Sequence, residues 1–295
     1  MRAQGSGDHV GPGGLHQPLE VPWSEQVAGD RHTCVRPGTM PHLLDGLGHL
    51  QGIDAVVHTG DASEDGTAQS YRLLHEILDP FAASLDAPLA VVMGNHDVSA
   101  VYGETVVPGE RLPAAQDRVV PLPRDGRLII LDSSVPGAGY GHLAPEQLDW
   151  LREQLAVPAA GGSVLAIHHP PLVAATSLLR GLDLDGLDEL AAVLAGSDVS
   201  IVLSGHYHHE MSGEVAGIPA HVAPGITNVV DPLGGGADER ALALSGASLI
   251  ELGGGAPRVI STVLPNAGDV LEDPERPVYR FDPAQVARIL EAAGR

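Results

Sequence analysis

Short, mostly apolar runs alternate along much of the chain with longer segments of helical periodicity. A β-rich run of four to six residues without regular polar alternation is typical of a strand buried on both faces of a sheet. The runs that fit are residues 53–58, 89–93, 128–131, 164–167 and 199–203. The segments between them that predict helices are residues 41–50, 67–78, 145–156 and 186–194. This alternation predicts a layered α/β fold.

The pattern changes after Glu210, where strand-like runs follow one another without helices between them. Residues 215–222, 247–252 and 259–264 have the composition of strands and are separated by glycine-rich turns. A final helix is predicted near residues 283–293. We therefore expect a second sheet that packs on the first. The length of 295 residues is within the range of one large α/β domain.

Polar clusters follow four of the buried runs, at the ends where ligands gather in open α/β sheets. These clusters are residues 59–61 (TGD), 94–97 (GNHD), 168–171 (HHPP) and 205–208 (GHYH). The metal-ligand candidates in them are Asp61, Asn95, His168, His206 and His208. Oxygen and imidazole ligands without a thiolate suit Mn, Fe, Zn or Co rather than a structural cysteine-type zinc site.

The four clusters together favour a site with two metal ions. A Gly-Asp pair alone is more often a turn, and a lone histidine is more often structural. The carboxylate of Asp61, however, can bridge two cations, and the other candidates then divide between them. His206 and His208 would point the same way from an extended segment. Two metals a few ångströms apart clamp the attacking and leaving oxygens of a phosphoryl displacement.

Charge and composition limit the classes of binding partner that we expect. The formal net charge is −22, from 16 basic and 38 acidic residues, and no Lys/Arg block occurs, which argues against nucleic acid or an anionic membrane surface. A small diffusible substrate fits better. The single Cys34 excludes an intramolecular disulfide framework, and residues 1–14 lack the apolar core of a signal peptide. No apolar run approaches the roughly 18 to 20 residues of a membrane span. We therefore expect a cytoplasmic protein.

Three longer segments carry a family resemblance beyond the metal motifs. Residues 128–151 (LIILDSSVPGAGYGHLAPEQLDWL), 164–172 (VLAIHHPPL) and 199–218 (VSIVLSGHYHHEMSGEVAGI) resemble the mycobacterial-type class III cyclic nucleotide phosphodiesterases, within the calcineurin-like metallophosphoesterase superfamily. The similarity covers roughly residues 50–265. It implies a four-layer α/β/β/α sandwich with a dinuclear metal site at the carboxyl ends of the strands, and a homodimer as a candidate assembly.

The resemblance also implies residue roles. Asp61 would bridge the two metals, Asn95, His168 and His206 would complete the second site, and His208 would belong to the first. The catalytic residues would be His96, which contacts the phosphate and protonates the leaving oxygen, and Asp97, which orients it. A metal-bridging hydroxide would be the nucleophile.

The chain departs from the family at the first motif, which normally supplies Asp-x-His at the end of a strand. Asp8 and His9 resemble that motif with the carboxylate slipped by one position, and we prefer them as ligands of the first metal. Asp30 and His32 have the right internal spacing, but a poor strand precedes them. We therefore divide the chain into an atypical N-terminal segment, residues 1–38, and a phosphoesterase domain, residues 39–295.

Two classes of function remain open from the sequence. The preferred one is a phosphodiesterase that uses two divalent transition metal ions to hydrolyse cyclic nucleotides, such as 3',5'-cAMP or 2',3'-cyclic nucleotides, or related small phosphodiesters. The other is a degraded relative that keeps one metal and binds a phosphorylated ligand with little turnover, because the first motif is damaged. Within the enzyme class, a phosphomonoesterase, a glycerophosphodiesterase and a nucleotide-sugar pyrophosphatase also remain.

Overall fold

The computed structural model describes residues 39–106, 115–233, 239–253, 255–266 and 277–295. The helices are α2 (Thr39–Leu47), α3 (Ala68–Ser84), α4 (Ser99–Val106), α5 (Pro145–Leu155), α6 (Ser177–Arg180), α7 (Leu187–Leu194) and α8 (Pro283–Ala292). The strands are β1 (Val56–His58), β2 (Leu89–Val91), β3 (Arg118–Leu122), β4 (Gly126–Leu131), β5 (Gly141–His142), β6 (Ser163–Ile167), β7 (Leu184–Asp185), β8 (Val199–Ser204), β9 (Met211–Val215), β10 (Ile218–Val222), β11 (Val229–Val230), β12 (Glu239–Leu242), β13 (Leu244–Glu251), β14 (Arg258–Pro265) and β15 (Pro277–Phe281). Among the described helices, none is long and apolar enough to cross a membrane.

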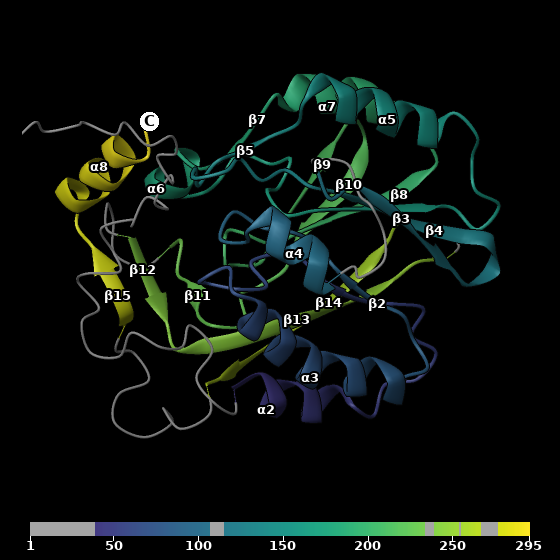
Figure 1. Cartoon of the computed structure of the whole chain (residues 1–295), viewed down its shortest axis with the longest axis horizontal. Coiled ribbons are helices and arrows are strands. Elements are labelled where there is room, and N and C mark those ends of the chain that lie inside the picture. The colour runs from purple at the N-terminus through teal and green to yellow at the C-terminus, as the bar shows by residue number, and fades with distance from the viewer. Residues whose placement is uncertain (1–38, 107–114, 234–238, 254, 267–276) are drawn as a thin grey trace, which may run out of the picture.

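A six-stranded sheet in the order β3-β4-β6-β8-β10-β9 forms the centre of the fold (Figure 1). Its four middle strands are parallel, and β3 and β9 are antiparallel edges. Strand β4 shows why it is buried on both faces. Ile129 and Leu131 pack into the core shared with α5 and α7, whereas Leu128 and Ile130 pack into a second core on the opposite face. Parallel pairing brings the carboxyl ends of these strands to one edge.

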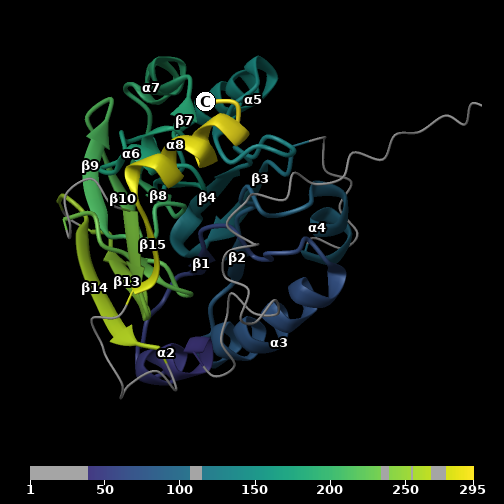
Figure 2. The ribbon, with the colours of Figure 1, turned by 90° about the vertical axis from the view of Figure 1, so that its left-hand side faces the viewer.

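The other layers lie against that second core. Ala90 and Val92 join it from the β2 side, and Ile250 of β13 packs against it. Helices α2 and α3 then cover β2 through a third core that contains Met40, Tyr71 and Val91. Figure 2 shows the resulting layers, in which α5 and α7 form one outer layer and α2 and α3 form the other. The predicted four-layer α/β/β/α sandwich is therefore confirmed.

A smaller unit lies at one side of the sandwich. The strands β11, β12 and β15 form a three-stranded antiparallel sheet, and α6 contacts α8 beside it. Helix α8 begins at a capping box in which Asp282 and Gln285 exchange side-chain to backbone hydrogen bonds, and Pro283 occupies its first turn. The predicted final helix is confirmed within one residue.

The region after Glu210 differs from the prediction. Residues 215–222 do not form one strand in a second sheet, because Ala216 and Gly217 both adopt positive φ, at 53° and 78°, and turn the chain back on itself. Two consecutive left-handed residues make the tight turn of a β-hairpin. The resulting strands β9 and β10 extend the central sheet, and of the runs predicted beyond residue 210 only β13 and β14 lie in the second layer.

Candidate metal centre

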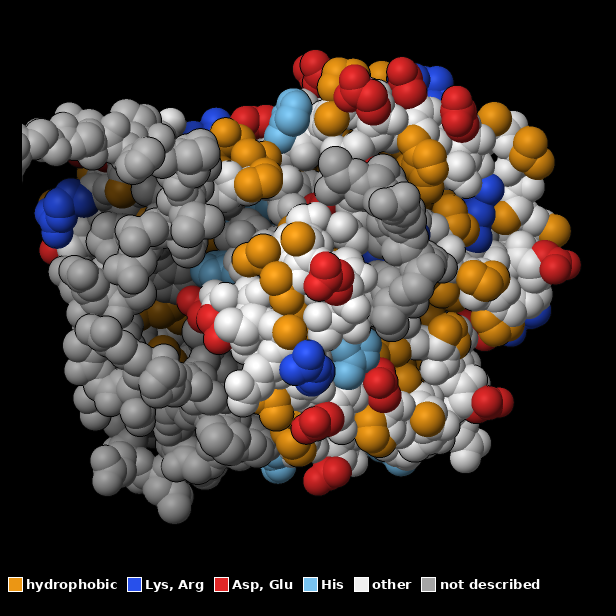
Figure 3. Space-filling view, viewed as in Figure 1, with side chains coloured by type: hydrophobic (Ala, Val, Ile, Leu, Met, Phe, Trp, Pro, Cys, Tyr) orange, Lys and Arg blue, Asp and Glu red, His pale blue; other side chains and the backbone are white. Residues whose placement is uncertain are grey.

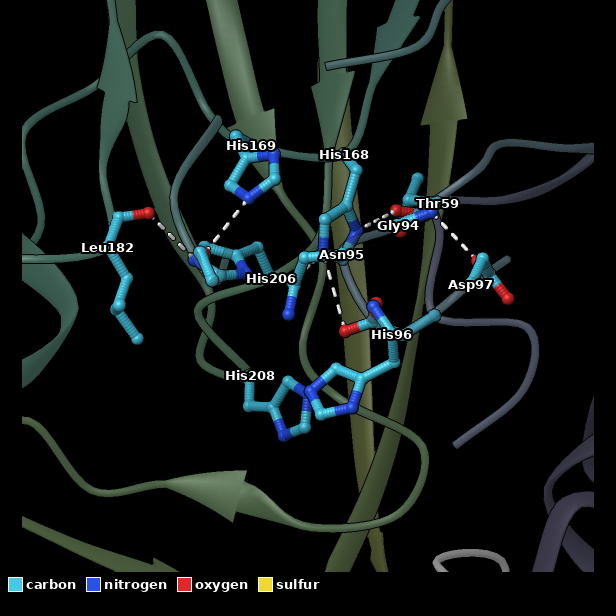
Figure 4. Close-up of polar contacts among 12 residues, drawn as sticks. Thr59, Gly94, Asn95, His96, Asp97, His168, His169, Leu182, His206 and His208 are labelled. Carbon is cyan, nitrogen blue, oxygen red and sulfur yellow. Dashed lines mark hydrogen bonds and ion pairs between the residues drawn. The ribbon is translucent and has the colours of Figure 1, made fainter. Parts of the chain in front are cut away.

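The four predicted clusters converge at the carboxyl ends of β1, β2, β6 and β8, where Figure 4 shows their side chains facing a common space. Asp61 follows β1, Asn95 and His96 follow β2, His168 directly follows β6, and His206 and His208 follow β8. The sheet topology thus assembles residues that are up to 147 positions apart in the sequence, from 61 to 208.

The imidazole of His168 occupies the centre of this arrangement. Its Nδ1 donates to the carbonyl of Thr59 at 2.8 Å. Its Nε2 lies 3.3 Å from Oδ2 of Asp61 and 3.1 Å from Oδ1 of Asn95. Because Nδ1 carries a hydrogen, a neutral ring would point its Nε2 lone pair at two oxygen atoms. Such an arrangement requires a cation between the three atoms, either a proton on His168 or a metal ion.

The electrostatics of this group are consistent with that requirement. Burial opposes the charged form of Asp61, but the neighbouring His168 holds the pKa of its carboxyl well below the ordinary value. Burial likewise opposes protonation of His168, but Asp61 raises the pKa of its imidazole above the ordinary value. A divalent cation binds a carboxylate in its deprotonated form. It could also replace the proton that Asp61 favours on His168.

His206 provides the fourth donor of this set. Its Nε2 donates to the carbonyl of Leu182 at 3.0 Å, which leaves Nδ1 as the nitrogen with a free lone pair. Its ring centroid lies 5.0 Å from that of His168. Burial lowers the pKa of His206 well below its ordinary value, so the ring is neutral. A neutral imidazole whose other nitrogen donates to a carbonyl is the usual form of a metal-binding histidine.

His169 belongs to the same histidine cluster, and ring nitrogens of His168, His169 and His206 lie within 4.8 Å of one another. Both of its nitrogens are engaged, however. Nδ1 accepts from the hydroxyl of Ser133 at 2.8 Å, and Nε2 donates to the carbonyl of Gly139 at 3.2 Å. Burial lowers its pKa to about 3. His169 therefore supports the ligand rings by packing, a role that the His-His doublet alone did not reveal.

His96 lies near the ring of His208 (Figure 4), and its side chain is partly exposed. Its backbone N–H donates to Oδ1 of Asp61 at 3.1 Å, which ties the two loops together. Its Nδ1 lies 3.3 Å from Oε2 of Glu64. The ring of His96 is thereby paired with an acidic side chain through Nδ1. Sequence reasoning missed Glu64, because an acidic residue in a loop after a strand reads as part of a solvated turn.

The buried carboxylate of Asp97 holds the backbone of two loops of the site. Its carboxylate accepts from the backbone N–H groups of Gly94 at 2.8 Å, Ala62 at 3.1 Å and Ser63 at 3.0 Å. Burial, together with the nearby charge of Asp61, raises its pKa to about 7. Asp97 therefore fixes the backbone of the β1 and β2 loops, and its role in orienting His96 stays a prediction.

The loops approach so closely that glycine is required. Gly60 has φ 109°, and a Cβ there would lie 2.1 Å from Nδ1 of His168. A Cβ on Gly94 would lie 2.2 Å from Oδ1 of Asp61. Asp61 itself adopts a positive φ of 53°, a strained conformation for a residue with a side chain. Two candidate ligand histidines also have positive φ, 66° at His206 and 54° at His208, so the expected extended segment there is wrong.

The remaining predicted ligands belong to the N-terminal segment, residues 1–38. Asp8, His9, Asp30 and His32 all lie outside the described residues. Among the described residues, the candidates for the first metal are Asp61 and His208. The donors that are present fit a hard or borderline divalent cation at the second position, because two oxygens and two imidazoles converge there.

Several curated proteins are similar to this chain in sequence. A probable cyclic nucleotide phosphodiesterase of Rhodococcus erythropolis is 43% identical over 171 residues, which cover 58% of this chain and 56% of that protein. A cAMP/cGMP dual specificity phosphodiesterase of Mycobacterium tuberculosis is 42% identical, with 58% of this chain and 53% of that protein covered. A 3',5'-cyclic adenosine monophosphate phosphodiesterase of Escherichia coli is 32% identical, with 55% and 57% covered.

The chain spans little more than half the length of these curated relatives. The profile of the calcineurin-like phosphoesterase family matches residues 27–210, which include all four clusters of the site. The match begins inside the segment that we separated as residues 1–38, and it contains Asp30 and His32 but not Asp8 and His9. Membership implies divalent metal ions at the site. The four converging clusters and this match together place the chain in the calcineurin-like phosphoesterase family.

Proposed function

We propose that this chain is a metal-dependent phosphodiesterase that hydrolyses cyclic nucleotides or related small phosphodiesters. The observation that carries the proposal is the convergence of His168 Nε2 with the oxygens of Asp61 and Asn95, beside the partly exposed His96. The cyclic nucleotide phosphodiesterases among the relatives support the substrate class. The charge supports a small substrate, and Figure 3 shows acidic side chains over the α5 and α7 face.

The described residues divide into two tasks. Asp61, Asn95, His168 and His206 would hold one metal, and Asp61 and His208 would contribute to the other together with Asp8 and His9. The two metals, when bound, would polarise the phosphate and lower the pKa of a bound water toward neutrality. Asp97, Gly60 and Gly94 keep the loops in place, so that the metal donors are fixed before the substrate binds.

His96 would act on the leaving group. With Nδ1 beside Glu64, its Nε2 would be the nitrogen that donates a proton to the departing alkoxide. A cyclic diester has a poor leaving group, because the ribose oxygen departs as an alkoxide unless it is protonated. This requirement is the reason that a positioned acid is needed there.

The identity of the metals and the assembly are further parts of the proposal. The oxygen and imidazole donors favour Mn, Fe, Zn or Co. We expect a cytoplasmic homodimer from the sequence, and sedimentation of the full chain with and without Mn²⁺ would test the dimer.

The decisive experiment uses the purified full chain, stripped with chelator and reloaded with Mn²⁺. We expect hydrolysis of bis(p-nitrophenyl) phosphate and of 3',5'-cAMP only after reloading. Surface-exposed His42 provides a matched control, since His42→Ala removes a histidine of α2 outside the described contacts of the site. Full activity in the stripped protein would overturn the proposal, and so would loss of activity in His42→Ala equal to that in His168→Ala.

A second candidate follows from the first metal motif. Among the described residues, only Asp61 and His208 represent that site, and a protein with one metal would bind a phosphorylated ligand with little turnover. Comparing Asp8→Ala/His9→Ala with Asp30→Ala/His32→Ala tests this alternative. Loss of the metal at the first site in one of the two double mutants would assign the missing ligands. Unchanged metal binding in both double mutants, with negligible turnover in the parent chain, would support the single-metal alternative. A panel with phosphomonoesters and glycerophosphodiesters then defines the substrate.

A further inference from the structure

The loop that follows β10 covers His208, the histidine assigned to the first metal site. Residues 224–230 follow β10 and pass directly over His208, whose backbone carbonyl accepts from the N–H of Val230 at 3.0 Å. A Cβ on Gly225 would lie 3.0 Å from Cγ of His208 and 2.3 Å from the carbonyl oxygen of Asn228. Only glycine permits this close approach of the loop to the ring.

The loop presents one polar group to the imidazole. Oδ1 of Asn228 lies 3.0 Å from Nδ1 of His208. The amide of Asn228 donates through Nδ2 to Oγ1 of Thr227 at 3.2 Å, which turns its oxygen toward the histidine. A carboxamide oxygen can only accept, so the hydrogen must be on Nδ1 of His208, and Nε2 keeps its lone pair.

Buried side chains of the β13–β14 hairpin hold this loop in place. Asn266, 2% exposed, donates through Nδ2 to the carbonyl of Thr227 at 2.9 Å. The hydroxyl of Ser245, also 2% exposed, donates to the carbonyl of Ile226, and the N–H of Gly246 donates to the carbonyl of Gly225 at 2.9 Å. Consecutive residues of the loop are thus fixed to one rigid element, and Asn228 has little freedom to move away from His208.

We propose that Asn228 is the positioning residue of the first metal site: it fixes His208 as the Nδ1–H tautomer and aims Nε2 at the metal. The inference rests on the proposed function, which assigns His208 as a metal ligand. It adds a residue beyond the family match, which ends at residue 210. A partner that accepts from the other ring nitrogen of a metal-binding histidine typically contributes 10- to 100-fold to metal affinity, so the effect is measurable.

The test compares Asn228→Ala with Asn228→Asp in the full chain. Asn228→Ala should weaken Mn²⁺ binding at the first site, to which His208 is assigned, by roughly 10- to 100-fold in calorimetric titration. It should leave the second site, at His168, unchanged. Asn228→Asp keeps an accepting oxygen and should retain affinity within a few-fold. Nitrogen NMR of the metal-free protein should report Nδ1–H at His208 in the parent and in Asn228→Asp, and a mixture of tautomers in Asn228→Ala. Circular dichroism of each variant checks the fold.

A double-mutant cycle separates this inference from the proposed function. If Asn228 acts through His208, then Asn228→Ala should cost nothing further in a His208→Ala background. Unchanged Mn²⁺ affinity and tautomer in Asn228→Ala would overturn the inference, as would failure of Asn228→Asp to restore both. Unchanged Mn²⁺ binding in His208→Ala would instead overturn the assignment of His208 as a ligand.

Discussion

Oε2 of Glu64 lies 3.3 Å from Nδ1 of His96, across the loops that follow β1 and β2. The carboxylate is half-exposed and the ring is one-fifth exposed, so the pair lies at the mouth of the site rather than in its interior. In this position Glu64 can fix the orientation of the His96 ring.

Glu64→Gln should lower the hydrolysis rate of 3',5'-cAMP by up to about 10²-fold, because a ring that is no longer held is misplaced relative to the leaving oxygen. Metal content should be unchanged, since Glu64 is outside the ligand set. Glu104→Gln, an exposed substitution in α4, is the matched control. An effect of Glu64→Gln that persists undiminished in a His96→Ala background would contradict action through His96.

His96→Ala should lower the rate by roughly 10²- to 10⁴-fold on a diester with a poor leaving group. The loss should be much smaller on bis(p-nitrophenyl) phosphate, because p-nitrophenolate departs without a proton. Steady-state rates on both substrates, with metal analysis of each preparation, make the comparison. Equal losses on the two substrates, or loss of a metal ion, would show that His96 has another role.

The sequence predicted the central strands and the order of the four clusters, because continuous apolar runs and the polar residues after them are local features. It missed the turn at Ala216 and Gly217, since an alanine at positive φ leaves no signal in composition. It also missed Glu64 and Asn228. Each acts on a histidine in another loop, and such contacts exist only once the sheet has brought the loops together.

Asn95→Ala should release the tightly held metal, because this site has four described donors and loses one of its two oxygens. We expect the parent chain to retain one metal per chain through dialysis and to gain activity as added Mn²⁺ fills a second, weaker site. Metal analysis after dialysis and an activity titration measure the two quantities. Two equally retained metals in the parent chain would contradict the difference between the sites.

Asp117 should make the folded chain less stable as pH rises. Burial raises its pKa from 3.8 to about 6, so between these pH values the folded chain keeps a proton that the unfolded chain releases. Because the unfolded state then binds fewer protons, the free energy of unfolding falls as pH rises from about 4 to 6, by roughly 3 kcal/mol in total.

Asp117→Asn removes this ionisation and keeps Oδ1, which accepts from the N–H of Asp132 and from Gln147. Urea unfolding at pH 4, 5, 6 and 7, with chelator present so that metal binding does not contribute, should show the stability of the variant falling less steeply. Parallel pH profiles for the two proteins would mean that Asp117 is already ionised in the folded chain at low pH.

Strand β1 has three residues and, among the described strands, pairs with β2 alone, yet it carries Asp61 into the site. Local opening of so small a sheet costs less free energy than global unfolding, and it would carry Asp61 away from His168. A metal that binds only the closed form would oppose the opening, by about 2.7 kcal/mol at a hundred times its dissociation constant. Hydrogen exchange at the β1 amides would therefore slow as metal is added. The exchange rate of these amides would then report the metal occupancy of the site without any substrate.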